Sequence, residues 1–259
     1  MIKFFRAIRQ SLLTENPTNS KAGRYLFYAI GEILLVVIGI LIALGINNWN
    51  QQIKDDKLGK DLLVRIRRDL AQDTLNFRAT INFNNKVRDE LKELLVTLYD
   101  GVDRKEQVQQ MSGIWDKALD QSFSPNDNTY RNIVSSGTLG LIKNLKLKEE
   151  IIDLYSEYDQ KKDLLASINV WMIGIASAMD TETEFIKFSS EVSDIYTSEE
   201  MLNENDFAFL NNKEDPRFKL LVRAITAAAF NQKANNAYRQ ELIKKCEMAL
   251  QQIDLELAK

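Results

Sequence analysis

The first pattern along the chain is a continuous apolar run near its N-terminus. Residues 25–46 contain a single charged side chain, Glu32. A helix of this length extends about 33 Å at ~1.5 Å per residue, which is enough to cross a hydrocarbon core of ~30 Å. Tyr25, Tyr28 and Trp49 stand near the ends of the run, where interfacial aromatic residues are common. The pattern therefore predicts one transmembrane helix over residues 25–46, and we expect no second span.

The predicted membrane helix carries a face suited to contact with another helix. Glu32, Val36, Gly39 and Ala43 follow one another at steps of four, three and four residues, so they share this face. Gly39 and Ala43 form a small-x-x-x-small pair, which lets a second helix approach closely. A carboxylate within the bilayer is costly unless it is partnered or neutral, so we expect Glu32 to be buried against a neighbouring helix or basic group. The alternatives are a side chain that reaches back to the membrane surface and an ion-coupled role for Glu32.

Residues 1–24 are basic, and their pattern is that of an amphipathic helix. Met1, Phe4, Phe5, Ile8 and Leu12 would share one helical face, and the basic residues Lys3, Arg6 and Arg9 lie off it. This pattern is typical of a helix on an anionic inner leaflet, and an ordinary charged flank is the simpler alternative. A short basic tail is hard to translocate, whereas a large downstream domain crosses largely regardless of its charge. We therefore expect residues 1–24 in the cytoplasm and residues 47–259 in the periplasm. A cleaved signal peptide is the main alternative to an uncleaved anchor.

After the membrane helix, apolar positions recur at steps of three and four residues, which predicts long helices. The first has about fifty residues, continues the membrane helix and ends at Gly101. Further helices are predicted over residues 107–121, 128–137 and 145–188, short pieces around 199–202 and 207–210, and a last long helix that begins at Pro216. Together they predict an all-α protein: a single N-terminal transmembrane helix followed by an elongated up-and-down four-helix bundle.

Composition limits the chemistry available to this bundle. The chain has no histidine and one cysteine, Cys246, which excludes Ser-His-Asp and Cys-His arrangements and an intrachain disulfide. Cys246 lies in a helical pattern, so we expect a small core or flank residue and no nucleophile. The net charge is −3, and residues 1–28 account for +4, so the remainder carries −3 − 4 = −7. An acidic body of this kind does not favour nucleic-acid binding. We expect no catalytic residue, no metal and no cofactor.

Three groups of residues need a choice between a functional and a structural interpretation. "NIVSSGTLGLIKN" (132–144) lacks the phosphate-loop spacing, and we interpret it as a tight connection between two helices around Gly137 and Gly140. Tyr158, Trp171, Met172 and Met179 could line a ligand cavity, but their helical spacing favours plain core. Asp73, Thr80 and Asn84 interrupt the apolar seam of the first long helix, so we expect that helix to change partners along its length.

Three stretches carry a resemblance to a known family: "MIKFFRAIRQSLL", "RYLFYAIGEILLVVIGILIALGINNWN" and "TYRNIVSSGTLGLIKNLKLKEEIIDLYSEY". Together they resemble an uncharacterised family of single-pass membrane proteins that is widespread in Bacteroidota, a domain of unknown function. The resemblance implies an inner-membrane protein of a Gram-negative cell with its body in the periplasm, and it implies no activity.

The expected function is a non-enzymatic subunit or scaffold of an inner-membrane complex. Its expected partners are membrane lipid and a second copy or other inner-membrane proteins, with no nucleic acid. The alternatives are a periplasmic ligand-sensing bundle that signals through a partner protein, and a stator-like ion-coupled subunit that uses Glu32.

Overall fold

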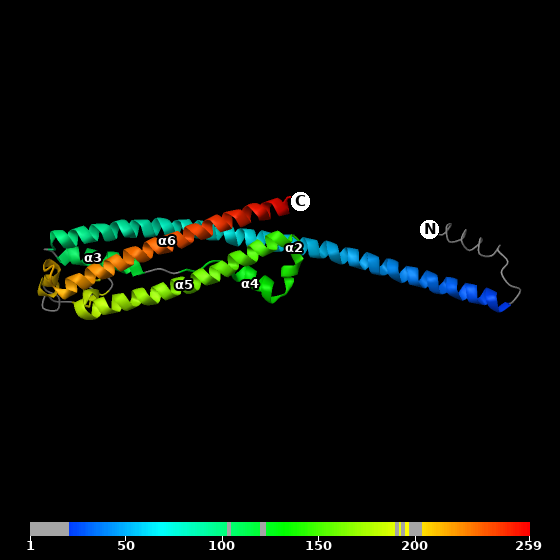
Figure 1. Ribbon diagram of the computed structural model, residues 1–259, viewed down its shortest axis with the longest axis horizontal. Coiled ribbons are helices and arrows are strands. Elements are labelled where there is room, and N and C mark those ends of the chain that lie inside the picture. The colour runs from blue at the N-terminus through cyan, green and yellow to red at the C-terminus, as the bar shows by residue number, and fades with distance from the viewer. Residues whose placement is uncertain (1–20, 103–104, 120–122, 190–191, 193–194, 197–203) are drawn as a thin grey trace. The chain divides into compact units, whose positions relative to one another are not determined.

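The computed structural model describes residues 21–102, 105–119, 123–189, 192, 195–196 and 204–259. Every regular element among these residues is a helix, which confirms the predicted all-α class (Figure 1). The chain divides into two compact units, one ending at Leu58 and the other spanning Gly59–Lys259. The predicted basic residues Lys3, Arg6 and Arg9 lie outside the described residues.

Helix α2 runs from Lys21 to Asp100 and passes through both units. The prediction that the first bundle helix continues the apolar helix is therefore confirmed. Gly101 ends it as predicted: its φ of 108° is a left-handed value that favours glycine, and its N–H donates to the carbonyl of Thr97 at 3.0 Å.

The connection between the first and the next long helix consists of short elements. They are α3 (Lys105–Leu119), α4 (Asn128–Ser135) and the 3₁₀ helix η1 (Thr138–Leu141), close to the predicted ranges. Gly137 has a φ of 70° at the start of η1, so the tight turn predicted there is present. Gly59 of α2 lies against η1, because a Cβ on it would come within 2.5 Å of the Leu141 carbonyl oxygen.

Two long antiparallel helices complete the second unit. α5 spans Leu145–Thr183 and α6 spans Pro216–Leu257. The Asn144 side chain caps α5, and the Asp215 side chain caps α6. Pro216 stands in the first turn of α6, as the sequence predicts. The shorter 3₁₀ helices η2 (Phe185–Phe188) and η3 (Glu204–Asn211) lie between them in the chain. The predicted piece at 207–210 falls within η3, and the one at 199–202 lies outside the described residues.

One predicted boundary is wrong. A single helix was expected over residues 145–188, but α5 ends at Thr183, and the next residue, Glu184, has a left-handed φ of 52°. The Asp180 carboxylate accepts the N–H of Ile186 at 2.8 Å, so a side chain replaces the helical acceptor beyond the break. The turn brings Phe185 and Phe188 into the core, where both are buried.

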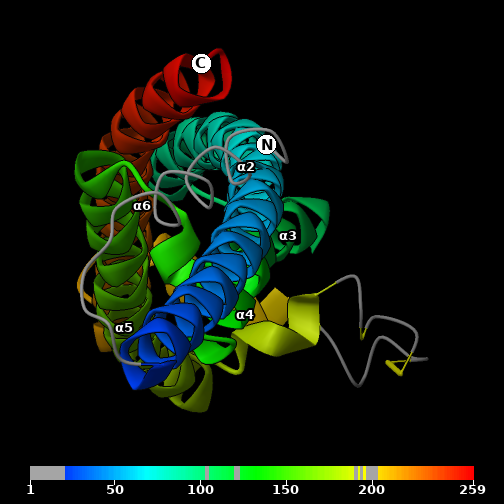
Figure 2. The same ribbon diagram turned by 90° about the vertical axis from the view of Figure 1, so that its right-hand side faces the viewer.

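In the second unit α5 and α6 lie side by side, and the α2 segment runs along α6 (Figures 1 and 2). Side-chain contacts pair α2 with α6 in antiparallel fashion: Arg67 with Asp254 at 2.5 Å, Arg78 with Glu247, and Asn84 Nδ2 donating to Asn236 Oδ1 at 2.8 Å. Two apolar cores follow one another along this bundle. The first joins residues 62–77, 147–158 and 242–253, and the second joins residues 87–102, 108–118, 185–188 and 218–228.

Trp171 corrects another expectation. Tyr158, Met172 and Met179 are buried core residues as predicted, but the Trp171 side chain is 49% exposed. The buried stripe of α5 passes through Leu165, Met172 and Met179 at seven-residue steps. Trp171 precedes Met172 by one position, hence by about 100° around the helix, which carries its ring off the stripe.

Candidate functional site

A buried polar cluster occupies the junction of α2, α5, α6 and residues 123–127. At its centre is Asp73, with 1% of its surface exposed. Asn126 donates to its Oδ1 twice, from the backbone N–H at 2.9 Å and from Nδ2 at 2.6 Å. The Tyr158 hydroxyl donates to Oδ2 at 3.1 Å and lies 3.0 Å from the Cys246 Sγ. One carboxylate thus links α2 to α5 and to the segment between α3 and α4.

The ionisable groups in this cluster are shifted mainly by burial. Burial raises the pKa of Asp73, although the hydrogen bonds from Asn126 and Tyr158 oppose the shift. Burial raises the pKa of the Cys246 thiol to about 12 and that of the Tyr158 hydroxyl well above its ordinary value. Cys246 is fully buried, which confirms the predicted core position. A protonated thiol enclosed in a core is a poor nucleophile, so the cluster has a structural character.

Aromatic rings enclose the cluster. The Phe123 ring stacks on Phe77 with centroids 5.7 Å apart and meets the ring of Tyr158 edge-on at 6.3 Å. On the other side, Tyr130 stacks on Tyr155 at 4.2 Å. The Tyr155 hydroxyl is buried without a hydrogen-bond partner among the described residues, only one helical turn from the fully bonded Tyr158. The hydroxyl of Tyr158 is therefore hydrogen-bonded, and that of its neighbour Tyr155 is not.

A polar layer on α6 separates the two apolar cores. Asn231, Gln232, Asn235 and Arg239 are all buried there. Arg239 Nη1 donates to Asn235 Oδ1 at 2.7 Å, and its guanidinium lies 5.6 Å from the Phe123 ring centroid. Burial lowers the pKa of Arg239 to about 10, so it stays charged at neutral pH.

Asp73 and Asn84 on α2 were expected to interrupt the apolar seam of that helix, and both are buried and hydrogen-bonded. The α6 layer was not anticipated, although its polar residues at steps of one, three and four were visible in the sequence.

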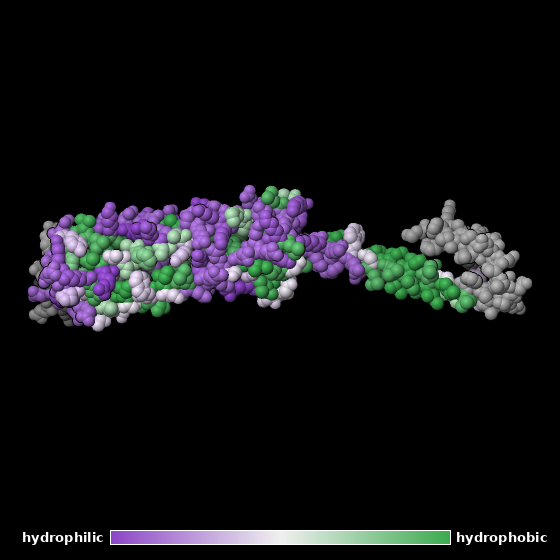
Figure 3. Space-filling model, viewed as in Figure 1, coloured by the Kyte–Doolittle hydropathy of each residue, from purple (hydrophilic) through white to green (hydrophobic). Residues whose placement is uncertain are grey.

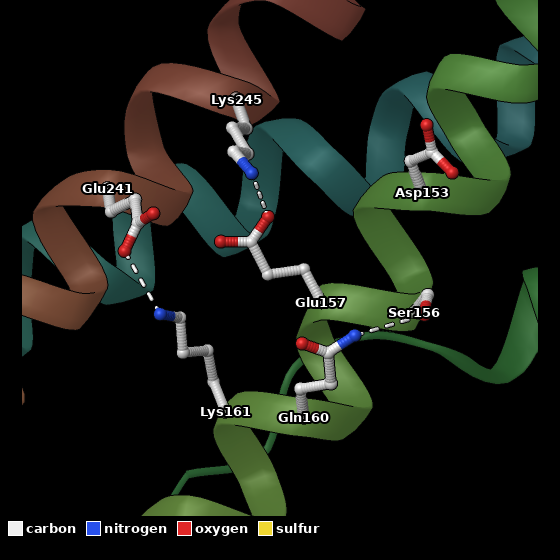
Figure 4. A pocket seen from close by; sticks show the side chains of 7 residues that line it. All are labelled: Asp153, Ser156, Glu157, Gln160, Lys161, Glu241 and Lys245. Carbon is white, nitrogen blue, oxygen red and sulfur yellow. Dashed lines mark hydrogen bonds and ion pairs between the residues drawn. The ribbon is translucent and has the colours of Figure 1, made fainter.

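A surface groove of about 440 Å³ runs between α5 and α6 (Figure 4). Lys161 Nζ donates to the Glu241 carboxylate at 3.0 Å, and Lys245 pairs with Glu157 across the same two helices. Both carboxylates that face these lysines are therefore ion-paired, so these side chains serve to join α5 to α6. Partly exposed pairs of this kind contribute about 0–1 kcal/mol each. Among the described residues, no group of three or more Cys, Asp or Glu side chains is placed to hold a metal ion.

The apolar segment of the first unit has no covering protein surface. Its residues from Tyr28 onward are exposed apart from the half-buried Ile38, and Figure 3 shows them as a continuous apolar stretch. The four residues of the predicted contact face, Glu32, Val36, Gly39 and Ala43, are all exposed. A Cβ added to Gly39 would meet no atom within 4 Å, so the small position is open to a partner.

By length and composition, two described helices could cross a membrane. The α2 window has a mean hydropathy of 2.8 and none of it is buried, and a window in α5 has a mean hydropathy of 1.3 with 17% buried. The α5 window therefore meets the same criterion at a much lower hydropathy, and the expectation of a single span stays a prediction.

Fold and site together define an all-helical protein in which an uncovered apolar helix leads into a bundle with a closed polar cluster. The chain belongs to DUF6090, a family of unknown function, whose model matches residues 32–212. The match begins at Glu32 and ends after η3, so it includes most of the apolar segment and stops short of α6. No curated protein and no solved structure matches the chain.

Proposed function

We propose that this chain is a non-enzymatic subunit or scaffold of an inner-membrane protein complex. The apolar helix over residues 25–46 anchors it, residues 1–24 lie in the cytoplasm, and the helical bundle occupies the periplasm. The observation that carries the proposal is the apolar α2 window, of which no part is buried. Exposed apolar surface of this extent is stable in lipid or against another protein, and not in water.

The side chains that could act in catalysis are missing, buried or hydrogen-bonded, which favours a binding role over catalysis. The chain has no histidine, and its one thiol is buried beside Tyr158. Ser135 and Ser136, at the C-terminal end of α4, donate to backbone carbonyls three residues earlier, which is a local structural role. The closed cluster around Asp73 fixes the bundle, and a fixed bundle on a membrane helix is suited to presenting a surface to partners.

The face Glu32, Val36, Gly39 and Ala43 is the proposed contact within the membrane. Affinity purification of the tagged full chain from native membranes in mild detergent, followed by mass spectrometry, should give a stoichiometric assembly. Glu32→Leu and Gly39→Leu should each disperse that assembly and leave the far-UV circular dichroism unchanged. Leu41→Ala is the matched control, because residue 41 lies on the opposite side of the helix. Assembly of both face variants like the parent would contradict the contact.

The proposed orientation is tested separately by labelling. Lys233 is exposed on α6, and Cys246 is buried, so a Lys233→Cys chain carries one accessible thiol among its described residues. A membrane-impermeant maleimide should label it in cells whose outer membrane is permeabilised. Labelling that appears only after lysis of the inner membrane would reverse the orientation.

A further inference from the structure

The side of α2 that faces away from the bundle carries a line of apolar residues. Leu63 and Leu70 of this helix are buried in the core, whereas Val64 is 52% exposed and Leu75 is 62% exposed. The half-buried Ala71 lies between Val64 and Leu75, and these three residues fall within about 40° of one another around the helix. Exposed apolar side chains that adjoin one another on a folded domain commonly mark a contact surface.

Basic side chains flank this apolar line on both edges. Lys60 stands about 40° to one side of Val64, and Arg68 and Arg65 stand about 40° and about 100° to the other side. The Arg68 side chain is 77% exposed, and Arg65 is exposed as well. Over residues 59–78, the only exposed acidic residue of α2 is Asp61. The line is therefore bordered by positive charge.

The two remaining basic residues of this stretch are used within the bundle. Arg67 pairs with Asp254 at 2.5 Å and Arg78 pairs with Glu247, so both guanidinium groups are bound to α6. The three basic residues that flank the apolar line make no such pair with α6 among the described residues. They give this face a positive charge, although residues 29–259 as a whole carry −3 − 4 = −7.

Charge selects an acidic partner for this face over a second copy of the chain. Two copies anchored in one membrane run in the same direction, and pairing through this face would bring Arg68 of one copy toward Arg68 of the other, which is destabilising. The apolar residues recur at steps of seven and four positions, which are the intervals at which an amphipathic helix presents its own apolar side chains. A helix with acidic residues beside its apolar stripe complements both features.

We propose that the outward face of α2 between Lys60 and Leu75 docks an amphipathic helix of another protein whose apolar stripe is flanked by acidic residues. The face is about 23 Å long and one helix wide, which places it among small interfaces of modest affinity. The contact rests on the proposed function, because it names a kind of partner for the subunit, and it is independent of the contact face at Glu32.

A pair of designed peptides tests the chemistry of the partner. Each is a helix of about 18 residues, which at ~1.5 Å per residue covers the length of the face. One has leucines at steps of three and four residues with glutamates on both edges, and the other has lysines in place of the glutamates. Fluorescence anisotropy measures the binding of each labelled peptide to the full chain in phosphatidylcholine nanodiscs. The acidic peptide should bind about tenfold or more tightly than the basic one, and added salt should weaken its binding.

Two variants locate the bound peptide. Arg65→Glu combined with Arg68→Glu reverses the charge of one edge, so the affinity for the acidic peptide should fall about tenfold or more. Leu75→Ala removes an apolar contact at an exposed position and should lower the affinity about threefold or more. Lys233→Glu combined with Lys244→Glu, at exposed positions on α6, is the matched control and should leave the affinity unchanged. All variants should keep the far-UV circular dichroism of the parent.

The membrane contact is separated from this one by Gly39→Leu. This variant should disperse the membrane assembly and leave the binding of the acidic peptide unchanged, so the two proposals fail independently. Failure of the acidic peptide to bind, or equal binding of the two peptides, would show that this face does not select an acidic helix. Unchanged affinity in either α2 variant would place the peptide elsewhere. Displacement of the peptide by phosphatidylglycerol vesicles that bind the same face would show that its ligand is a lipid surface.

Discussion

Helices α2 and α5 each contain an 18-residue window apolar enough to cross a membrane, with mean hydropathies of 2.8 and 1.3. In α2 no residue of that window is buried. In α5 the apolar residues divide between a buried stripe, which includes Leu165 and Met172, and an exposed face, which includes Val170 and Ile173. The comparison shows that hydropathy measures how apolar a helix is, whereas the arrangement of its apolar residues decides whether a protein core can use it.

The two windows also differ in the hydrogen bonds and ion pairs that join their helices to the rest of the protein. α5 is tied to α2 by the Tyr158–Asp73 hydrogen bond and to α6 by the ion pairs of the surface groove. The apolar segment of α2 contains one ionisable side chain between Tyr28 and Ile46, Glu32, and it is exposed. We therefore regard α5 as a bundle helix with a free face and residues 25–46 as the candidate anchor.

The largest expected effect comes from removing the α2 window. A chain that begins at Gly59 should move from the membrane fraction to the soluble fraction and retain strong helical circular dichroism, because both apolar cores lie within residues 59–259. The matched change in α5, Val170→Glu with Ile173→Glu in the full chain, should leave it in the membrane fraction. Should the shortened chain still require detergent for extraction, the α5 window would have to be regarded as a membrane segment.

The next effect distinguishes the two faces of α5. Met172 is 2% exposed, so Met172→Ala should lower the free energy of unfolding by about 2–5 kcal/mol through lost burial and a residual cavity. The neighbouring Trp171→Ala should cost less than about 1 kcal/mol, since half of that ring is already in solvent. Urea unfolding of the chain that begins at Gly59 measures both. Equal losses would mean that α5 is rotated so that both side chains face the core.

Two tyrosines on α5 test how the helix is held to α2. Tyr158→Phe removes a hydroxyl that donates to the buried Asp73, and it should cost about 1.5–3 kcal/mol at neutral pH. Tyr155→Phe is the control, because that buried hydroxyl has no partner in the described part of the chain and its removal should be nearly neutral. Urea denaturation measures both. Equal effects would show that the contact with Asp73 is not the reason for the stability lost in Tyr158→Phe.

The Tyr158→Phe effect should depend on pH. The pKa of Asp73 is raised mainly by burial, so its contribution to stability is fully present below its unfolded pKa and is lost as pH rises through its folded pKa. Without the Tyr158 donor the folded pKa rises further. The cost of Tyr158→Phe should therefore grow as pH rises and the carboxylate becomes charged. A cost that shrinks with rising pH would contradict this account.

Local patterns were enough to predict most of the helices. The start of α6 at Asp215-Pro216 and the end of α2 at Gly101 both follow from residues whose backbone preferences are strong. The break of α5 at Glu184 was missed, because it depends on the Asp180 side chain and on burial of Phe185 and Phe188, which are tertiary effects. Trp171 was misplaced because apolar residues occupy nearly the whole circumference of α5 there, so periodicity alone does not identify the buried side.

The candidate site was less accessible to sequence reasoning. Asp73 was recognisable as a polar break in an apolar seam, but its partners come from positions 53 and 85 residues away. Nothing in the local sequence pairs Asp73 with Asn126 or Tyr158. The groups that determine its pKa become neighbours only when α2, α5 and the segment before α4 pack together.

The smallest expected effect concerns the surface groove. Lys161→Ala removes the ion pair with Glu241 and a contact 4.7 Å from the Tyr238 ring centroid. Because the Glu241 side chain is half exposed, the loss should be about 0.5–1 kcal/mol and should shrink as salt is added. A double-mutant cycle of Lys161→Ala and Glu241→Ala, measured by urea unfolding at low and high salt, isolates the pair. A coupling energy well above this range and insensitive to salt would indicate a buried, functional charge pair, and the groove would then have to be treated as a binding site.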